Sequence, residues 1–222
     1  MKFYVLEPEG DLFGTKWAYA DQVGQVLRSK EGEQCPVCGR FVTPLKWLPP
    51  HRVKLSTAKP EKWGDFVWGA GFLLIVSERF KEIYEREGLT GIEAFSPVEI
   101  VRIGRRKTGD LPLELPAYYL IEIMWGGADQ DDIASKVVWE KAPTCSYCRI
   151  DGHLLKSEGI ILKENSWTGV DIFIARGVPG TILVTERFKE VVERHNLRNA
   201  WFIPAEKYGW YESQPGLWYI LE

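Results

Sequence analysis

The chain has 222 residues and a formal net charge of −3; 45% of its residues are hydrophobic and 27% are charged. This composition is ordinary for a globular protein and excludes a disordered, collagen-like or coiled-coil chain. The charge also lacks the strong basic excess that is typical of a dedicated nucleic-acid binder. The length allows one large domain or two small ones.

The N-terminal segment contains a short, alternating, aromatic sequence, FYVLE at residues 3–7, which is typical of a strand. It has no extended apolar region of the kind that a secretory signal needs. The longest uncharged apolar stretch, residues 67–77, is shorter than the roughly 20 residues of a membrane-spanning helix. We therefore expect a cytoplasmic protein without membrane contact.

The first cysteine turn, residues 35–39, reads Cys35-Pro-Val-Cys38-Gly39 and has the form of a zinc knuckle. Two thiolates that are separated by two residues can bind one metal ion from a tight turn. The glycine after the second cysteine lets the backbone bend, so that amide groups approach the sulfur atoms.

A strand at residues 72–76 followed by a short amphipathic helix is predicted next in the chain. Ser77 is a good N-cap residue, and Gly88 can adopt the left-handed conformation that often follows a helix end. Apolar residues at i, i+3 and i+4 predict one buried face. These residues are Phe80, Ile83 and Tyr84.

An internal repeat is the clearest organisational signal. Residues 76–89 recur as residues 184–197 at an offset of 108, and nine of the 14 positions are identical. The second copy has its own N-cap, Thr185, and its own stop residue, Asn196. Two other segments, YYLIE at 118–122 and WYILE at 218–222, resemble FYVLE. Self-similarity at a fixed offset indicates a duplicated structural unit.

These signals predict an α+β fold in which two pseudo-repeated strand–helix–strand units pack into one body. The first unit spans residues 1–101 and the second spans residues 117–222, and the two can form a single compact domain. Residues 102–116 are rich in basic residues, proline and glycine and are interpreted as a linker or an exposed loop. Each unit carries one zinc-knuckle turn.

The second cysteine turn, residues 145–149, reads Cys145-Ser-Tyr-Cys148-Arg149 and completes a set of four thiols. Four thiolates suit tetrahedral Zn²⁺, so we predict one structural ion that is shared by the two turns and clamps the two units. Its ligands would be Cys35, Cys38, Cys145 and Cys148.

Other interpretations of the cysteines stay open. They are two disulfides, which a cytosolic chain rarely keeps, a thioredoxin-like redox pair, or four free thiols. A catalytic zinc with His153 as a substitute ligand is a further alternative, although a histidine in a loop is more often solvated.

Catalytic motifs are missing from the sequence: it contains no nucleophile elbow, no phosphate-binding loop and no H-E-x-x-H. We therefore expect a binding protein and not an enzyme. An aromatic run near the C-terminus, predicted to lie on a loop, is the candidate partner-binding surface, because Trp and Tyr are favoured at the centres of interfaces. Its residues are Tyr208, Trp210 and Tyr211.

Together, CPVCGR near residue 35, the second Cys-x-x-Cys and the segment SERFKEIYEREGLTGIEAFSPVEI resemble the double-CxxCG motif family of myxobacterial proteins. Members of this family look like immunity proteins of the Sit-type swarm-inhibition system, in which a lipoprotein toxin passes between kin cells. The resemblance implies a cytoplasmic immunity protein that binds and neutralises the C-terminal domain of a cognate toxin. Arg149 departs from the family's pattern, which has a glycine at this position.

Two other functions stay open. A zinc-ribbon-type nucleic-acid-binding protein would use Arg40, Arg149 and the basic run at residues 102–107, although the net charge does not favour nucleic acid. A cysteine-based metal or redox protein would use the four thiols themselves.

Overall fold

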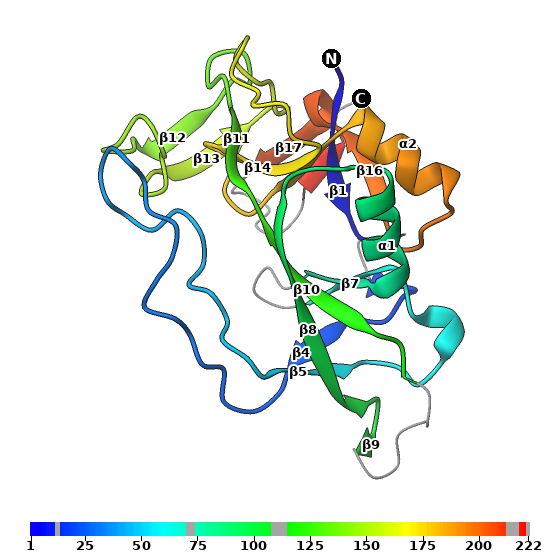
Figure 1. Cartoon of the computed structure of the whole chain (residues 1–222). Coiled ribbons are helices and arrows are strands. Elements are labelled where there is room, and N and C mark those ends of the chain that lie inside the picture. The colour runs from blue at the N-terminus through cyan, green and yellow to red at the C-terminus, as the bar shows by residue number, and fades with distance from the viewer. Residues whose placement is uncertain (12–13, 70–73, 108–114, 212–217, 221–222) are drawn as a thin grey trace.

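The computed structural model describes residues 1–11, 14–69, 74–107, 115–211 and 218–220 (Figure 1). In these residues, strands predominate and two α-helices accompany them, which is the α+β class that the sequence predicts. No helix in the described ranges is long and apolar enough to cross a membrane.

One sheet has five strands in the order β11-β14-β15-β1-β16 and carries helix α2, Glu186–Arg194. All neighbouring pairs are antiparallel except β11 with β14. Its strands are β1 (Phe3–Glu7), β11 (Trp125–Asp129), β14 (Ile172–Arg176), β15 (Ile182–Thr185) and β16 (Trp201–Pro204).

A second sheet has seven strands and carries helix α1, Glu78–Arg86. Its order is β4-β5-β8-β10-β7-β6, and β9 pairs with the end of β8. Its strands are β4 (Ala20–Gln22), β5 (His51–Leu55), β6 (Phe66–Trp68), β7 (Leu74–Ser77), β8 (Ile92–Ile103), β9 (Arg106–Lys107) and β10 (Tyr118–Ile123).

The remaining elements are small. A four-stranded sheet has the order β12-β13-β17-β18, and β2 pairs with β3. These elements and the two 3₁₀ turns are β2 (Gly10–Asp11), β3 (Gly14–Thr15), η1 (Pro60–Lys62), β12 (Val138–Lys141), β13 (His153–Ser157), η4 (Ala205–Lys207), β17 (Tyr208–Tyr211) and β18 (Trp218–Ile220).

Both helices begin and end where the sequence predicts. The side chains of Ser77 and Thr185 accept hydrogen bonds from the third residue of each helix, which satisfies a backbone N–H that has no partner within the helix. Gly88 and Asn196 have φ values of 62° and 49°, the left-handed conformation expected after a helix end. The predicted apolar faces are buried, and the Phe80 and Phe188 rings lie 6.1 Å apart between the two helices.

Two four-stranded portions of the sheets have the same strand order and the same register. We name β6, β7, α1, β8 and β10 the α1 unit, and β14, β15, α2, β16 and β1 the α2 unit. Their orders are β6-β7-β10-β8 and β14-β15-β1-β16. In the middle strands, Tyr119 pairs with Val76 and Pro97, and Tyr4 pairs with Val184 and Pro204.

The two halves of the chain that the sequence predicts, residues 1–101 and 117–222, exchange strands between the sheets. Strand β1 precedes the whole α1 unit in the sequence, yet it lies between β15 and β16 of the α2 unit. Strand β10 follows α1 and β8 and is inserted between β7 and β8. Figure 1 shows β1 beside β16 and α2, and β10 beside β7 and β8. Backbone hydrogen bonds therefore connect residues 1–101 with residues 117–222 through both sheets.

Two buried aspartates connect the units in matching ways. Asp65, before β6, accepts hydrogen bonds from the N-cap Ser77 at 2.7 Å and from the backbone of Arg198 at 2.8 Å. Asp171, before β14, accepts them from the N-cap Thr185 at 3.0 Å and from the backbone of Thr90 at 3.1 Å. Each carboxylate thus joins its own helix start to the segment that follows the other helix.

A long hairpin arm, residues 23–50, leaves β4 and returns to β5. Its two limbs are joined by backbone hydrogen bonds such as Ser29 N to the Lys46 carbonyl at 2.9 Å and Val42 N to the Glu33 carbonyl at 2.9 Å. The first cysteine turn lies at its tip. Figure 1 shows the arm reaching from β4 and β5 to the neighbourhood of β12. The arm therefore spans from the α1 sheet to the part of the chain that carries the second cysteine turn.

The predicted linker at residues 102–116 is partly a strand. Arg102 and Ile103 belong to the end of β8, and β9 pairs with them as Arg102 with Lys107 and Ile103 with Arg106. The interpretation as a linker or exposed loop is therefore wrong for this hairpin, because its backbone groups are paired in the sheet. Residues 108–114 of the predicted linker lie outside the described residues.

Candidate metal centre

The two cysteine turns meet at one place, and one sulfur atom from each of the four cysteines lies within 4.8 Å of all the others. The Sγ atoms of Cys35 and Cys145 are 3.9 Å apart, and those of Cys38 and Cys148 are 3.7 Å apart. These distances far exceed a disulfide bond of about 2.05 Å, and all four thiols are free. The two disulfides considered from the sequence are therefore not formed.

The dimensions of the cluster suit a single tetrahedral ion. Four sulfur ligands at about 2.3 Å from a central metal form a tetrahedron with edges of about 3.8 Å. Four edges cross between the turns, and two of them, at 3.7 and 3.9 Å, match this value. The cluster can therefore hold one metal ion that has two ligands on the arm and two on the second turn.

Both turns have the same backbone geometry. The amide of Gly39 donates to the Cys35 carbonyl at 2.9 Å, and the amide of Arg149 donates to the Cys145 carbonyl at 3.0 Å. Gly39 has a φ of 73° and Arg149 a φ of 55°, so both adopt the left-handed conformation. The turn thus places the two thiols of each pair on one side, and the arginine adopts the glycine's conformation.

Backbone amides favour the thiolate form of one cysteine in each turn. The amides of Cys148 and Tyr147 lower the pKa of Cys145 to about 7. Burial raises the pKa of Cys35, but the amides of Cys38 and Val37 outweigh it and lower the net value. Hydrogen bonds to the charged form stabilise it, and metals bind the thiolate. Burial instead raises the pKa of Cys148 to about 12, so each turn favours the thiolate form at its first cysteine only.

The cluster is enclosed on most sides. Cys35, Cys145 and Cys148 are buried, whereas Cys38 is exposed. Trp125 and Val42 pack against the cysteines, and the Trp125 ring lies 6.2 Å from that of Tyr147. Arg40 of the arm also forms an ion pair with Asp151, at 2.7 Å. The arm tip is thus held by polar and apolar contacts in addition to the cysteines.

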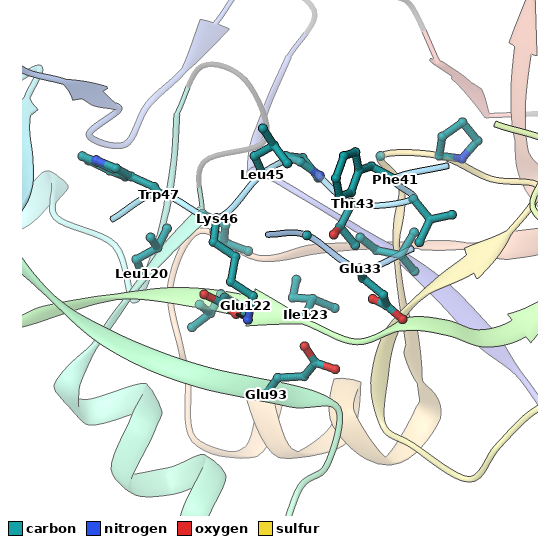
Figure 2. A pocket seen from close by; sticks show the side chains of 18 of the residues that line it. Glu33, Phe41, Thr43, Leu45, Lys46, Trp47, Glu93, Leu120, Glu122 and Ile123 are labelled. Atoms are coloured by element: carbon teal, nitrogen blue, oxygen red, sulfur yellow. Dashed lines mark hydrogen bonds and ion pairs between the residues drawn. The ribbon is translucent and has the colours of Figure 1, made fainter. Parts of the chain in front are cut away.

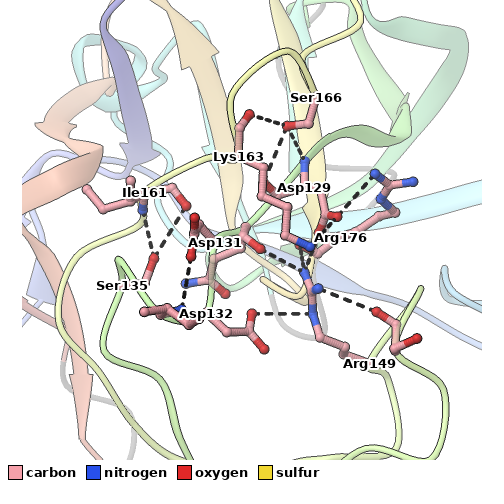
Figure 3. Close-up of polar contacts among 12 residues, drawn as sticks. Asp129, Asp131, Asp132, Ser135, Arg149, Ile161, Lys163, Ser166 and Arg176 are labelled. Atoms are coloured by element: carbon pink, nitrogen blue, oxygen red, sulfur yellow. Dashed lines mark hydrogen bonds and ion pairs between the residues drawn. The ribbon is translucent and has the colours of Figure 1, made fainter.

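Arg149 connects the second turn to the α2 unit (Figure 3). Its side chain is only 5% exposed and lies 2.6 Å from Asp129, the last residue of β11. It also donates to the carbonyl of Arg176 at 2.7 Å. Lys163 and Arg176 approach the same carboxylate at 2.8 and 3.3 Å. A buried arginine needs such partners because an unpaired charge in the interior is costly.

The three cationic side chains around Asp129 affect the pKa of its carboxyl group. Burial alone would raise the pKa of this carboxyl, but hydrogen bonds from Lys163 and Arg149 hold it below its ordinary value. Gly177 leaves the space that the guanidinium occupies, since a Cβ atom there would lie 2.1 Å from the Arg149 Nη2 atom. From the sequence, Arg149 is only a departure from the glycine of the family's pattern. The structure makes it the residue that fixes the turn to the sheet.

The other predicted site residues lie away from the cysteines. His153 is in β13, 51% exposed, and its Nδ1 atom contacts the Glu140 carboxylate. Tyr208 is 1% exposed and donates its hydroxyl to Glu7. The prediction that it offers an exposed contact is therefore wrong, because its ring is part of the core.

The aromatic run itself is strand β17 and not the predicted loop, and it pairs with β13 and β18. Trp210 is half-buried in this strand. The side chain of Tyr211 lies outside the described residues.

No family model matches the chain, and a search of the curated proteins finds no match. What the site can do chemically follows from its own geometry.

Proposed function

We propose that Cys35, Cys38, Cys145 and Cys148 bind one structural Zn²⁺ ion that fastens the arm to the α2 unit. Four thiolates are a donor set that Zn²⁺ favours, and structural zinc sites have all four positions filled by protein. All four sulfur atoms lie within 4.8 Å of one another, and two of the distances match the edge of a tetrahedral site, which supports a single ion. When bound, the ion would replace the thiol protons and hold two chain segments that are far apart in sequence.

We also propose that the chain is a cytoplasmic immunity protein that binds and neutralises the C-terminal domain of a cognate toxin. The observation that carries this proposal is the meeting of the two Cys-x-x-Cys turns, because these turns are the specific part of the resemblance to the double-CxxCG family. Residues 39–144 lie between the two pairs, yet the four sulfur atoms share one site. An inhibitor of this kind needs a rigid scaffold with an accessible surface and needs no catalytic group.

The nucleic-acid alternative is less well supported. It would use Arg149 for phosphate contacts, but this side chain is buried and bound to Asp129. It would also use Arg40, which is paired with Asp151. We expect no binding to generic DNA or RNA at low salt, where phosphate contacts are strongest.

The test of the immunity function is a growth assay. The protein encoded directly upstream of this chain's gene is expressed through its C-terminal domain, with and without this chain. We expect the domain alone to stop growth and co-expression of this chain to restore it. An unrelated toxin is the specificity control, and this chain should not protect against it. Equal killing with and without this chain contradicts the proposal.

We further propose that the α1 and α2 units descend from one duplicated sequence. The identical strand order and the matched register of Tyr4 and Tyr119 support this proposal. The repeated N-caps and the matching contacts of Asp65 and Asp171 add further support.

A further inference from the structure

A cavity of about 930 Å³ lies beneath the arm. Arm residues 41–47 form one wall, and residues 120–123 in β10 form another. Ile174 and Ile182 from β14 and β15 complete the apolar lining. The cavity is therefore bordered by both units and by the arm, and its shape depends on where the arm is held.

The arm is fixed at both ends of this cavity. At the tip, the four-cysteine centre and the Arg40–Asp151 pair hold it to the second cysteine turn. Near the base, the Lys46 Nζ atom lies 2.6 Å from a Glu122 carboxylate oxygen. These contacts fix the position of the arm on both sides of the cavity, and so they determine the shape of the cavity.

The cavity carries an excess of negative charge (Figure 2). Glu33 extends from the arm and Glu93 from β8, and Figure 2 shows both carboxylates pointing into the space between them. Lys46 is engaged by Glu122. The side chains of Glu33 and Glu93 both line the cavity and carry charges of the same sign. A cation between these two carboxylates would relieve their repulsion.

The arm also exposes apolar side chains. Among the described residues, nine large hydrophobic side chains are exposed, and four of them lie on the arm. Phe41, which is 42% exposed, borders the cavity. An exposed aromatic ring at the edge of a cavity can take part in binding a partner. The other three on the arm are Leu27, Val37 and Leu48.

We propose that a basic segment of the toxin docks in this cavity, with a Lys or Arg side chain between Glu33 and Glu93 and an apolar neighbour against Phe41. This inference rests on the immunity function proposed above. Charge complementarity selects a cationic occupant, and basic and aromatic side chains that fill such pockets are common anchors of protein interfaces. The four-cysteine centre then has a functional role, because it holds one wall of the docking site in place.

The experiment measures binding of the purified C-terminal domain of the upstream-encoded protein by calorimetry. The double variant Glu33→Gln/Glu93→Gln removes two charges from the cavity. Its control, Glu82→Gln/Glu190→Gln, removes two charges from exposed positions on α1 and α2. We expect the cavity variant to bind at least about tenfold more weakly and the control to change by less than about threefold. Phe41→Ala, at an exposed position, should also weaken binding by about tenfold.

The outcomes separate the two proposals. If the toxin domain binds all variants equally, the docking site is wrong and the immunity function stands. If it does not bind the unaltered chain, both proposals are wrong. Sedimentation of this chain alone tests another occupant, because a dimer that the cavity variant abolishes would place a second copy of the chain in the site.

Thermal melting must show that each variant is folded. The Gln variants should melt at or above the temperature of the unaltered chain, because they relieve the repulsion between the two carboxylates.

Discussion

The turn at Cys35–Cys38 lies at the tip of an extended arm, whereas the turn at Cys145–Cys148 is set against the α2 unit. A Cβ atom added to Gly39 would meet nothing within 4 Å, so the first turn has open space around its left-handed residue. At the equivalent position of the second turn, Arg149 is 6% exposed. The two turns thus have the same backbone geometry but different supports. The first turn is held by its contacts with the second turn, whereas the second turn is also held by the side chain of Arg149.

This difference shows how a position that favours glycine can accept a large residue. A left-handed conformation costs a non-glycine residue about 1–2 kcal/mol. Arg149 offsets that cost through its buried pair with Asp129 and its bond to the Arg176 carbonyl. The first turn has no comparable anchor in the described residues, so its position depends on the sulfur cluster, the Arg40–Asp151 pair and the arm's own base.

The largest expected effect concerns the exchange of strands between the two halves of the chain, which would be contradicted if either half folded alone. We expect residues 1–107 and residues 115–222, expressed separately, to lack cooperative thermal unfolding. The reason is that β1 is inserted in the α2 unit and β10 in the α1 unit. Mixing or co-expressing the fragments should restore the transition. Circular dichroism checks this, and independent folding of either fragment would contradict the strand exchange.

Metal removal should affect the two cysteine turns unequally. We expect a zinc chelator to lower the melting temperature by about 10 °C, equivalent to about 3 kcal/mol or more for a chain of this size. Hydrogen exchange should increase mainly in the arm, residues 23–50, because Arg149 still holds the second turn. Exchange in β1 and β15 serves as the internal control. Equal protection of the arm before and after chelation would show that the metal does not hold it.

Substitutions at the two left-handed positions should differ in size. Arg149→Ala breaks a buried ion pair, which we expect to cost about 3 kcal/mol, because Asp129 keeps Lys163 and Arg176. Arg149→Gly loses the same pair but relieves the backbone, so it should be about 1 kcal/mol more stable than Arg149→Ala. Gly39→Ala should cost only about 1 kcal/mol. Denaturant unfolding measures all three, and equal losses for Arg149→Ala and Gly39→Ala would contradict the anchoring role.

The smallest effect concerns pH and Glu33 on the arm. The folded chain raises the pKa of this carboxyl above its ordinary 4.5, so the folded state binds more protons than the unfolded state in the interval between the two values. The contribution of Glu33 to stability should therefore fall as the pH rises through that interval. Glu33→Gln should flatten this part of the profile, whereas Glu82→Gln should leave it unchanged. Melting temperatures between pH 4.5 and 7 measure the difference, and identical slopes would contradict a pKa of Glu33 that burial and the charge of Glu93 raise in the folded chain.

The local features of the fold could be predicted from the sequence because their causes are local. Ser77 and Thr185 cap the helices, and Gly88 and Asn196 end them, through contacts within a few residues. The exchange of β1 and β10 could not be predicted in the same way. The sequences FYVLE and YYLIE are both good strands in either sheet, and their own residues do not specify which neighbours they pair with.

In the candidate site too, the features with local causes could be predicted and those that depend on distant residues could not. The spacing within each Cys-x-x-Cys predicts a metal-binding turn, and the two turns do come together. The role of Arg149 was missed, because its partner Asp129 is 20 residues away and its neighbour Gly177 is further still. The only local signal was a large cation at a position where the matching turn has glycine. The prediction of an exposed loop at Tyr208 was wrong because a core strand and an exposed loop can have the same amino-acid composition.

The most direct test of the shared metal centre is the zinc content of the purified chain. Elemental analysis should find one zinc ion per chain. Replacing either pair, Cys35→Ser/Cys38→Ser or Cys145→Ser/Cys148→Ser, should reduce the content to nearly zero, because each pair alone supplies only two ligands. Two ions per chain, or one ion that survives the loss of either pair, would contradict a single ion held between the two turns.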